Sequence, residues 1–193
     1  FFLRDIEPIL TDVEENTFLR LGSDYQRDKF IEEFWKRRSV DSDGQRVAFK
    51  DIYELRLRVV KERYRGVHTD QGRIFIVNGP PDGMRRIDCQ DIYNPIELWY
   101  YERLETLRMN KITLLFFQSF GTGDFRLWTP LEGSQALFVG GIAGLTGIGT
   151  GRTVDITRCP EWREINGAMG AASSIFGTMG AQKMIDELKA GEK

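Results

Sequence analysis

The chain has 193 residues, a net charge of -2 and an apolar fraction of 41%, which is typical of a globular domain with a sizeable core. The slightly acidic balance argues against nucleic acid as a partner, because proteins that bind nucleic acid usually present a basic face. Apolar runs all fall short of the roughly 18 residues that a membrane-spanning helix needs. The chain begins with Phe1 rather than Met, which leaves room for a signal, an anchor or a domain ahead of it.

The first third of the chain predicts three helices. Thr11–Glu14 and Ser23–Gln26 each place a hydroxyl residue three positions before Glu or Gln, the pattern of an N-terminal capping box. The first helix is expected to run to Leu21, and the second to carry one apolar and one charged face. A third, longer helix is predicted over residues 46–64, where apolar residues recur at helical spacing.

The segment Gly66–Asp82, which we call the pivot, connects this helical part to a β-rich part. Gly66 is expected to end the third helix, and Thr69 and Asp70 to lie in the turn that follows. The apolar run Arg73–Val77 predicts a strand, which the Gly-Pro-Pro-Asp sequence that closes the pivot would end.

Three more strands are predicted, over residues 97–101, 112–118 and 124–128. The middle one is almost wholly apolar, which is typical of a central strand buried on both faces. Short turns rather than helical crossovers separate these segments, so neighbouring strands should be antiparallel. We therefore expect an α+β fold in which the N-terminal helices pack on a four-stranded antiparallel sheet.

The last part of the chain is rich in small residues. Residues 136–160 predict a Gly-rich connector, with neither a dinucleotide-binding fingerprint nor a phosphate loop. Residues 165–188 predict a helix whose small residues would let another helix approach closely. The expected units are residues 1–135, 136–160 and 161–193. The small residues that we single out as an interface are Gly170, Ser173, Gly177 and Ala181.

Two cysteines, Cys89 and Cys159, stand far apart in the chain. They either form a disulfide, as in an oxidising compartment, or are two unpaired residues. Neither belongs to a CxxC pair and the chain has one histidine, so no zinc site or histidine-rich metal centre is predicted. No cofactor is predicted, although a magnesium or calcium site made only of carboxylates stays open.

Several motifs occur in one order across residues 10–130. They are Gly66-Val67-His68-Thr69-Asp70, the following Gln71–Ile76 and Gly79–Asp82 segments, the upstream Phe30–Arg38 helix, and the downstream Glu97–Tyr101 and Gly123–Leu127 segments. On these motifs the chain resembles the GWxTD-domain family of bacterial proteins, with Val67 in place of the signature Trp. The resemblance implies a domain of unknown function, often found in exported or envelope-associated proteins, and it implies no catalytic residues.

The pivot holds the candidate site residues. His68 and Asp70 are the candidates for a catalytic base and its partner, because His68 is the only histidine. Arg73 is a candidate for binding an anionic ligand, or for pairing with Asp70 or Glu97. Asp82 is a second ligand candidate. Both aspartates have a simpler explanation, since such side chains accept hydrogen bonds from nearby backbone amides.

The predicted strands are rich in aromatic residues. Trp99 and Tyr101 belong either to the core or to an exposed aromatic interface that binds a partner.

These features favour a non-enzymatic interaction or scaffold domain in a bacterial cell-envelope assembly, with an extracytoplasmic location in the periplasm or cell envelope. The partner is expected to be a protein or a second copy, and any membrane association would run through a partner or a missing N-terminal anchor. Two alternatives stay open. One is an enzyme or ligand-binding domain with its site in the pivot, and the other is a structural subunit that self-associates through residues 165–188.

Overall fold

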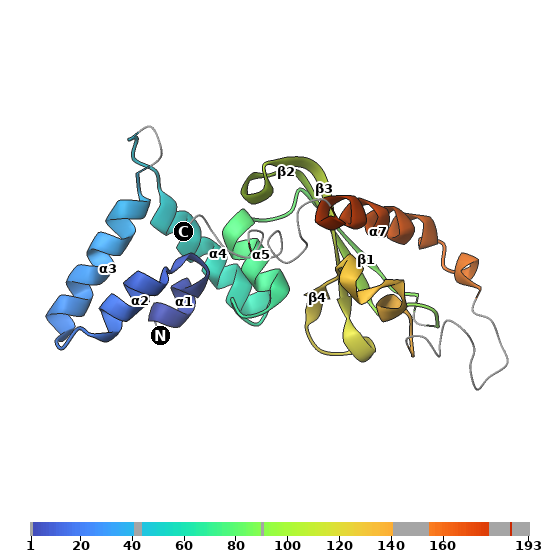
Figure 1. The fold of residues 1–193 in the computed structure, drawn as a ribbon, viewed down its shortest axis with the longest axis horizontal. Coiled ribbons are helices and arrows are strands. Elements are labelled where there is room, and N and C mark those ends of the chain that lie inside the picture. The colour runs from blue at the N-terminus through green and yellow to red at the C-terminus, as the bar shows by residue number, and fades with distance from the viewer. Residues whose placement is uncertain (1, 41–43, 90, 141–154, 178–185, 187–193) are drawn as a thin grey trace.

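The computed structural model describes residues 2–40, 44–89, 91–140, 155–177 and 186 (Figure 1). This part of the chain contains six α-helices and one antiparallel sheet of four strands in the order β1-β2-β3-β4, so the expected α+β fold is confirmed. The helices are α1 (Phe2–Ile6), α2 (Asp12–Leu19), α3 (Asp24–Arg38), α4 (Phe49–Arg63), α5 (Asp70–Asn78) and α7 (Trp162–Gly177). The strands are β1 (Gly83–Ile87), β2 (Ile96–Leu104), β3 (Met109–Gln118) and β4 (Phe125–Leu127).

The two predicted capping boxes start α2 and α3. Thr11 Oγ1 accepts a hydrogen bond from the Glu14 amide at 3.2 Å, and Ser23 Oγ accepts one from the Gln26 amide at 3.3 Å. The Glu14 carboxylate also accepts from Arg38 Nη2 at 2.8 Å, which joins α2 to the end of α3. Burial alone would raise the pKa of Glu14, but the bonds from Arg38 and Thr11 lower it to about 2.

The segment Arg73–Val77 lies in helix α5, so the prediction of a strand there is wrong. Thr69 is the N-cap of this helix, and its Oγ1 accepts a hydrogen bond from the Gly72 amide at 3.0 Å. Ile74, Phe75 and Ile76 in the apolar run that follows are all buried, so the sequence lacks the alternation that would distinguish a strand from a helix. The pivot therefore continues the helical part of the molecule.

The first strand of the sheet is β1, which the sequence did not predict because Gly-Met-Arg-Arg-Ile has no apolar alternation. The strands predicted over residues 97–101, 112–118 and 124–128 are confirmed as β2, β3 and β4. The four strands form a meander in which each pairs with the next along the chain.

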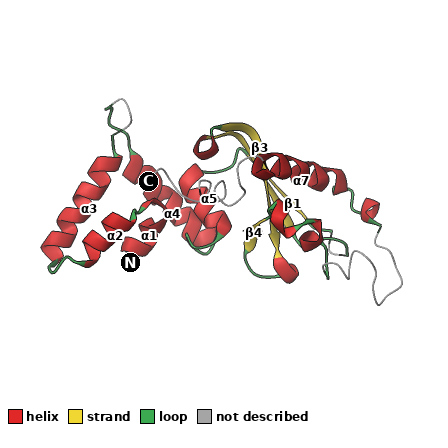
Figure 2. Cartoon of the chain, viewed as in Figure 1, coloured by secondary structure: helices red, strands yellow, loops and turns green. Residues whose placement is uncertain are grey.

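The sheet is covered on both faces, with α5 on one side and α7 on the other (Figure 2). Trp99 of β2 faces α5, where its ring centroid lies 6.3 Å from that of Phe75. Arg85 of β1 points to the other face, where its Nη1 lies 3.0 Å from Glu164 of α7. In Figure 1, α1 to α3 lie on the far side of α4 from the sheet, so the N-terminal helices reach the sheet through α4 and α5.

Helix α7 belongs to the same core as the strands rather than to a separate unit. Its buried residues join the single cluster that also holds Leu137 and Phe138, so the expected boundary at residue 135 falls inside the core. A disulfide links Cys89, after β1, to Cys159, before α7. The sequence left open whether the two cysteines are bonded or unpaired, and in the structure they form a disulfide. The buried residues of α7 are Ile165, Ala168, Ala172, Ile175 and Phe176.

Candidate functional site

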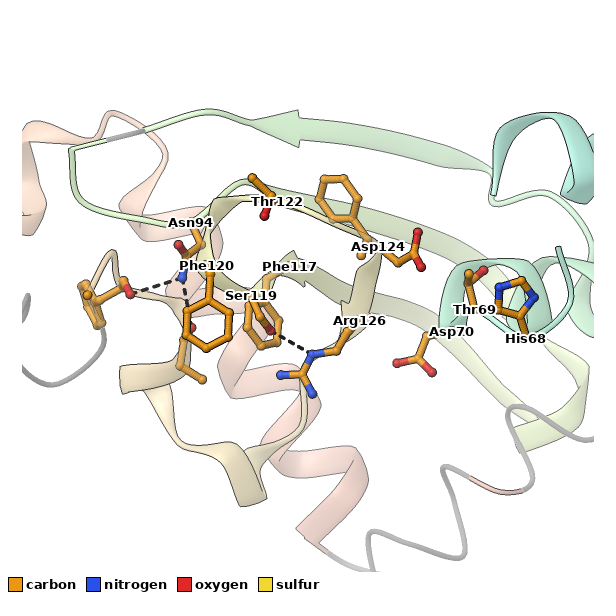
Figure 3. Close-up of a pocket in the computed structure, with 14 residues that line it drawn as sticks. His68, Thr69, Asp70, Asn94, Phe117, Ser119, Phe120, Thr122, Asp124 and Arg126 are labelled. Atoms are coloured by element: carbon orange, nitrogen blue, oxygen red, sulfur yellow. Dashed lines mark hydrogen bonds between the residues drawn. The ribbon is translucent and has the colours of Figure 1, made fainter. Parts of the chain in front are cut away.

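A surface pocket of about 990 Å³ lies between the start of α5 and the turn that joins β3 to β4 (Figure 3). Its lining combines His68, Thr69 and Asp70 of the pivot with aromatic residues from the end of the sheet. The sequence placed its candidate site in the pivot, and the fold adds a second wall from a segment about fifty residues further along the chain. This pocket is the candidate functional site.

The polar groups on the α5 side are hydrogen-bonded within the chain. Thr69 Oγ1 donates to the Tyr64 carbonyl oxygen at 2.7 Å in addition to capping α5. Asp70 Oδ2 accepts from the Leu127 backbone amide at 2.8 Å, which holds β4 against the start of α5. His68 is exposed, and within the described residues no hydrogen bond joins it to Asp70. The structure places both candidates of the catalytic pair in the lining of the same pocket.

Two tyrosines, the half-buried Tyr64 and the buried Tyr101, lie near the two ends of the pivot. The Tyr101 hydroxyl donates to the Gly79 carbonyl oxygen at 3.0 Å, and burial raises the pKa of Tyr101 well above its ordinary value. Burial and the nearby Glu97 carboxylate also raise the pKa of Tyr64, whose ring centroid lies 5.4 Å from that of Trp99. Both phenols therefore remain neutral hydrogen-bond donors at neutral pH.

Trp99 and Tyr101 lie in the core and are 0% and 2% exposed, so neither forms the aromatic interface that was one of their two expected roles. Trp99 and Tyr101 point to the same face of β2, where Phe75 of α5 and Gly79 cover them.

The other wall of the pocket is the turn between β3 and β4. Phe120 in this turn has φ of 60° and ψ of 21°, a left-handed conformation that costs a non-glycine residue about 1–2 kcal/mol. Its side chain is 96% exposed and lines the pocket (Figure 3). The turn thus holds an apolar ring in water on a strained backbone.

Charged groups around the pocket are paired with one another. Arg126 Nε donates to Ser119 Oγ at 2.9 Å, and its Nη2 lies 2.8 Å from a Glu132 carboxylate oxygen. Asp124 Oδ1 lies 3.3 Å from Arg65 Nη1. The pocket therefore offers an aromatic surface with balanced charge, which suits a partly apolar polypeptide better than a multiply charged anion.

A buried amide fixes the back of the pocket. Asn94 Nδ2 donates to the carbonyl oxygens of Ala136 and Phe138 at 3.3 and 3.2 Å. These bonds hold residues 136–138 against the end of the sheet, where the ring of Phe138 stacks on Tyr93 at 4.8 Å. The segment that the sequence assigned to a connector therefore begins as part of the pocket wall.

The two ligand candidates of the pivot lie away from the pocket lining. Arg73 Nη1 contacts Glu7 Oε1 at 2.7 Å. Asp82 Oδ2 accepts from the Glu102 backbone amide at 2.7 Å and ties the end of the pivot to β2. The simpler explanation of the aspartates, as acceptors from backbone amides, describes what both do.

The small residues singled out near the C-terminus fall partly on α7. Gly170 and Ser173 are exposed on the face of α7 that points away from the core. Gly177 is the last residue of that helix, and Ala181 lies outside the described residues.

Comparison of the chain with protein-family models, with curated proteins and with solved structures finds no match in any of the three. Over the described residues, no helix combines the length and the apolar character that crossing a bilayer requires.

Sequence reasoning missed Phe120 and Arg126 as site residues. The available signal was an aromatic residue placed next to Gly121 in a predicted hairpin turn, where an apolar ring has no core to enter.

Proposed function

We propose that the chain is a non-enzymatic protein-binding domain of the bacterial cell envelope and that it binds its partner at the pocket beside the β3–β4 turn. The exposed and strained Phe120 carries this proposal. An apolar ring in water gives the fold no burial energy, and the left-handed backbone that presents it costs energy. Contact with a partner would offset both, which is why such residues gather at binding sites.

The chemistry of the pocket supports a polypeptide partner. The half-buried ring of Phe125 lines the pocket together with exposed polar residues such as Thr122, so one surface can take both an apolar side chain and backbone groups. The envelope location is supported by the disulfide and by the resemblance to the GWxTD-domain family, since disulfides persist in oxidising compartments.

A specific observation supports each of two other functions. A ligand-binding or catalytic role is favoured by the presence of His68 and Asp70 in the lining of the same pocket. Self-association is favoured by the exposure of Gly170 and Ser173 on α7, where no atom lies within 4 Å of a Cβ built at Gly170.

Site-specific photo-cross-linking in native cells tests the proposal. A benzophenone amino acid replaces Phe120 in one variant and Thr122 in a second, and both positions line the pocket. The control replaces Tyr25, an aromatic residue on α3 that is 72% exposed and lies outside the pocket lining. We expect positions 120 and 122 to cross-link to the same envelope protein and position 25 not to do so.

The other outcomes decide between the alternatives. Cross-links from positions 120 and 122 only to a second copy of the chain would replace the proposal with self-association. Equal cross-linking from all three positions, or none from the two pocket positions, would reject the pocket as a protein-binding surface.

A further inference from the structure

A carboxylate faces the disulfide between Cys89 and Cys159. Glu161 Oε2 lies 3.6 Å from the Cys89 sulfur and 3.7 Å from the Cys159 sulfur. Bonded sulfurs carry no proton, so this oxygen faces two atoms that cannot donate a hydrogen bond to it. The other carboxylate oxygen, Oε1, lies 3.6 Å from Arg85 Nη2.

These distances fit the edges of a zinc tetrahedron. Zinc binds thiolate sulfur at about 2.3 Å and carboxylate oxygen at about 2.0 Å, so sulfur and oxygen ligands of one ion lie roughly 3.5 Å apart. Both measured distances are close to this value. Reduction removes the bond between the sulfurs and lets them separate to the roughly 3.8 Å that two zinc-bound thiolates need.

We propose that, when the disulfide is reduced by a dithiol or a phosphine, Cys89, Cys159 and Glu161 bind one Zn²⁺. Reduction adds two electrons and two protons to the disulfide and oxidises the reductant, which leaves two thiols. Zinc then forms two bonds to sulfur and displaces the two thiol protons to solvent. The Glu161 side chain is 27% exposed, so water can reach the fourth coordination position.

Arg85 offsets part of the charge of this site. Two thiolates and one carboxylate carry three negative charges, zinc carries two positive charges, and Arg85, which also pairs with Glu164, carries one more. Arg85 is itself held by Glu164 at 3.0 Å, so it can orient the Glu161 carboxylate from the second coordination shell. A metal ion here would link the segment after β1 to the start of α7, as the disulfide does in the oxidised chain.

Zinc titration of the full chain tests the proposal. The chain is reduced with a phosphine, exchanged under nitrogen into buffer without reductant, and titrated with Zn²⁺ alone by isothermal calorimetry. Co²⁺ replaces zinc in a parallel titration, because its absorption bands report thiolate bonds directly. We expect one ion per reduced chain, thiolate-to-cobalt bands, and no such binding to the oxidised chain.

Three variants separate this site from chance binding. Glu161→Gln removes a ligand and should weaken zinc binding by more than about tenfold, while Arg85→Gln removes the side chain that contacts the Glu161 carboxylate and should weaken zinc binding by about tenfold. Glu54→Gln is the matched control and should bind zinc within about twofold of the parent chain, because this exposed carboxylate lies on α4 and pairs with Lys50.

Equal zinc binding by the reduced and oxidised chains would overturn the proposal, and so would unchanged binding after Glu161→Gln. Reduction can loosen α7, so near-ultraviolet circular dichroism is recorded with and without zinc. Recovery of the native spectrum on adding zinc supports the site, and a reduced chain that zinc neither binds nor refolds rejects it.

Discussion

The two walls of the pocket use their side chains in opposite ways. At the start of α5, the side-chain oxygens of Thr69 and Asp70 form hydrogen bonds with backbone groups of the chain itself. At the β3–β4 turn, Phe120 leaves its ring in water and holds a left-handed backbone. The side chains at the start of α5 therefore stabilise the fold, whereas the exposed ring at the β3–β4 turn is accessible for contact with another molecule. Substitutions at the start of α5 should therefore change stability, and substitutions at the β3–β4 turn should change partner binding.

Gly72→Ala should have the largest effect on stability. A Cβ at this position would lie 2.0 Å from the Gly66 carbonyl oxygen and 2.8 Å from Thr69 Oγ1, and neither group can move without displacing the start of α5. We expect unfolding in denaturant to show a loss of more than about 3 kcal/mol. Gly170→Ala on α7 is the matched control, because its Cβ meets no atom within 4 Å and alanine favours a helix by up to about 1 kcal/mol.

Asp70→Ala should have the next largest effect. It leaves the Leu127 amide without its acceptor, which should lower the free energy of unfolding by about 1–3 kcal/mol. Asp70→Asn retains an acceptor oxygen and should lose less. If denaturant unfolding gave the same stability for the alanine variant and the parent chain, the hydrogen bond between α5 and β4 would not stabilise the fold.

Glu14, in the helical part of the chain, resembles Thr69 and Asp70 because its side chain also forms hydrogen bonds within the chain. Its pKa is lowered in the folded state, from 4.5 to about 2, by Arg38 and Thr11. The stabilisation is therefore complete above pH 4.5 and is lost as the pH falls towards 2. Thermal unfolding across this range should show a steeper decline for the parent chain than for Glu14→Gln. Parallel curves would mean that Glu14 makes no net contribution.

Phe120→Gly should have the smallest effect on stability and a large effect on binding. Glycine adopts the left-handed conformation without strain, but it loses more conformational entropy on folding. We therefore expect the free energy of unfolding to rise by between zero and about 1 kcal/mol. Partner cross-linking from position 122 should be lost in the same variant. A stability loss of more than about 1 kcal/mol would place Phe120 among the residues that hold the fold together.

Local chemistry predicted the elements whose cause is local. The hydroxyl residues Thr11 and Ser23, each followed by Glu or Gln at the third position, start α2 and α3 as expected. The apolar run at residues 112–118 lies in β3, the strand between β2 and β4. The strand predicted at Arg73–Val77 in the pivot was wrong, because a short buried apolar run has the same sequence pattern in a strand and in a helix.

By itself the sequence determined the α+β class, the helices α2, α3 and α4, and three of the four strands. These follow from hydrogen bonds and periodicities that span a few residues. Tertiary structure decided that α5 is a helix, that Asp70 meets Leu127, and that Phe120 completes the pocket. It also decided that Glu161 meets both sulfurs. Each of these depends on segments that are distant in the chain and become neighbours only when the core packs, which no local pattern encodes.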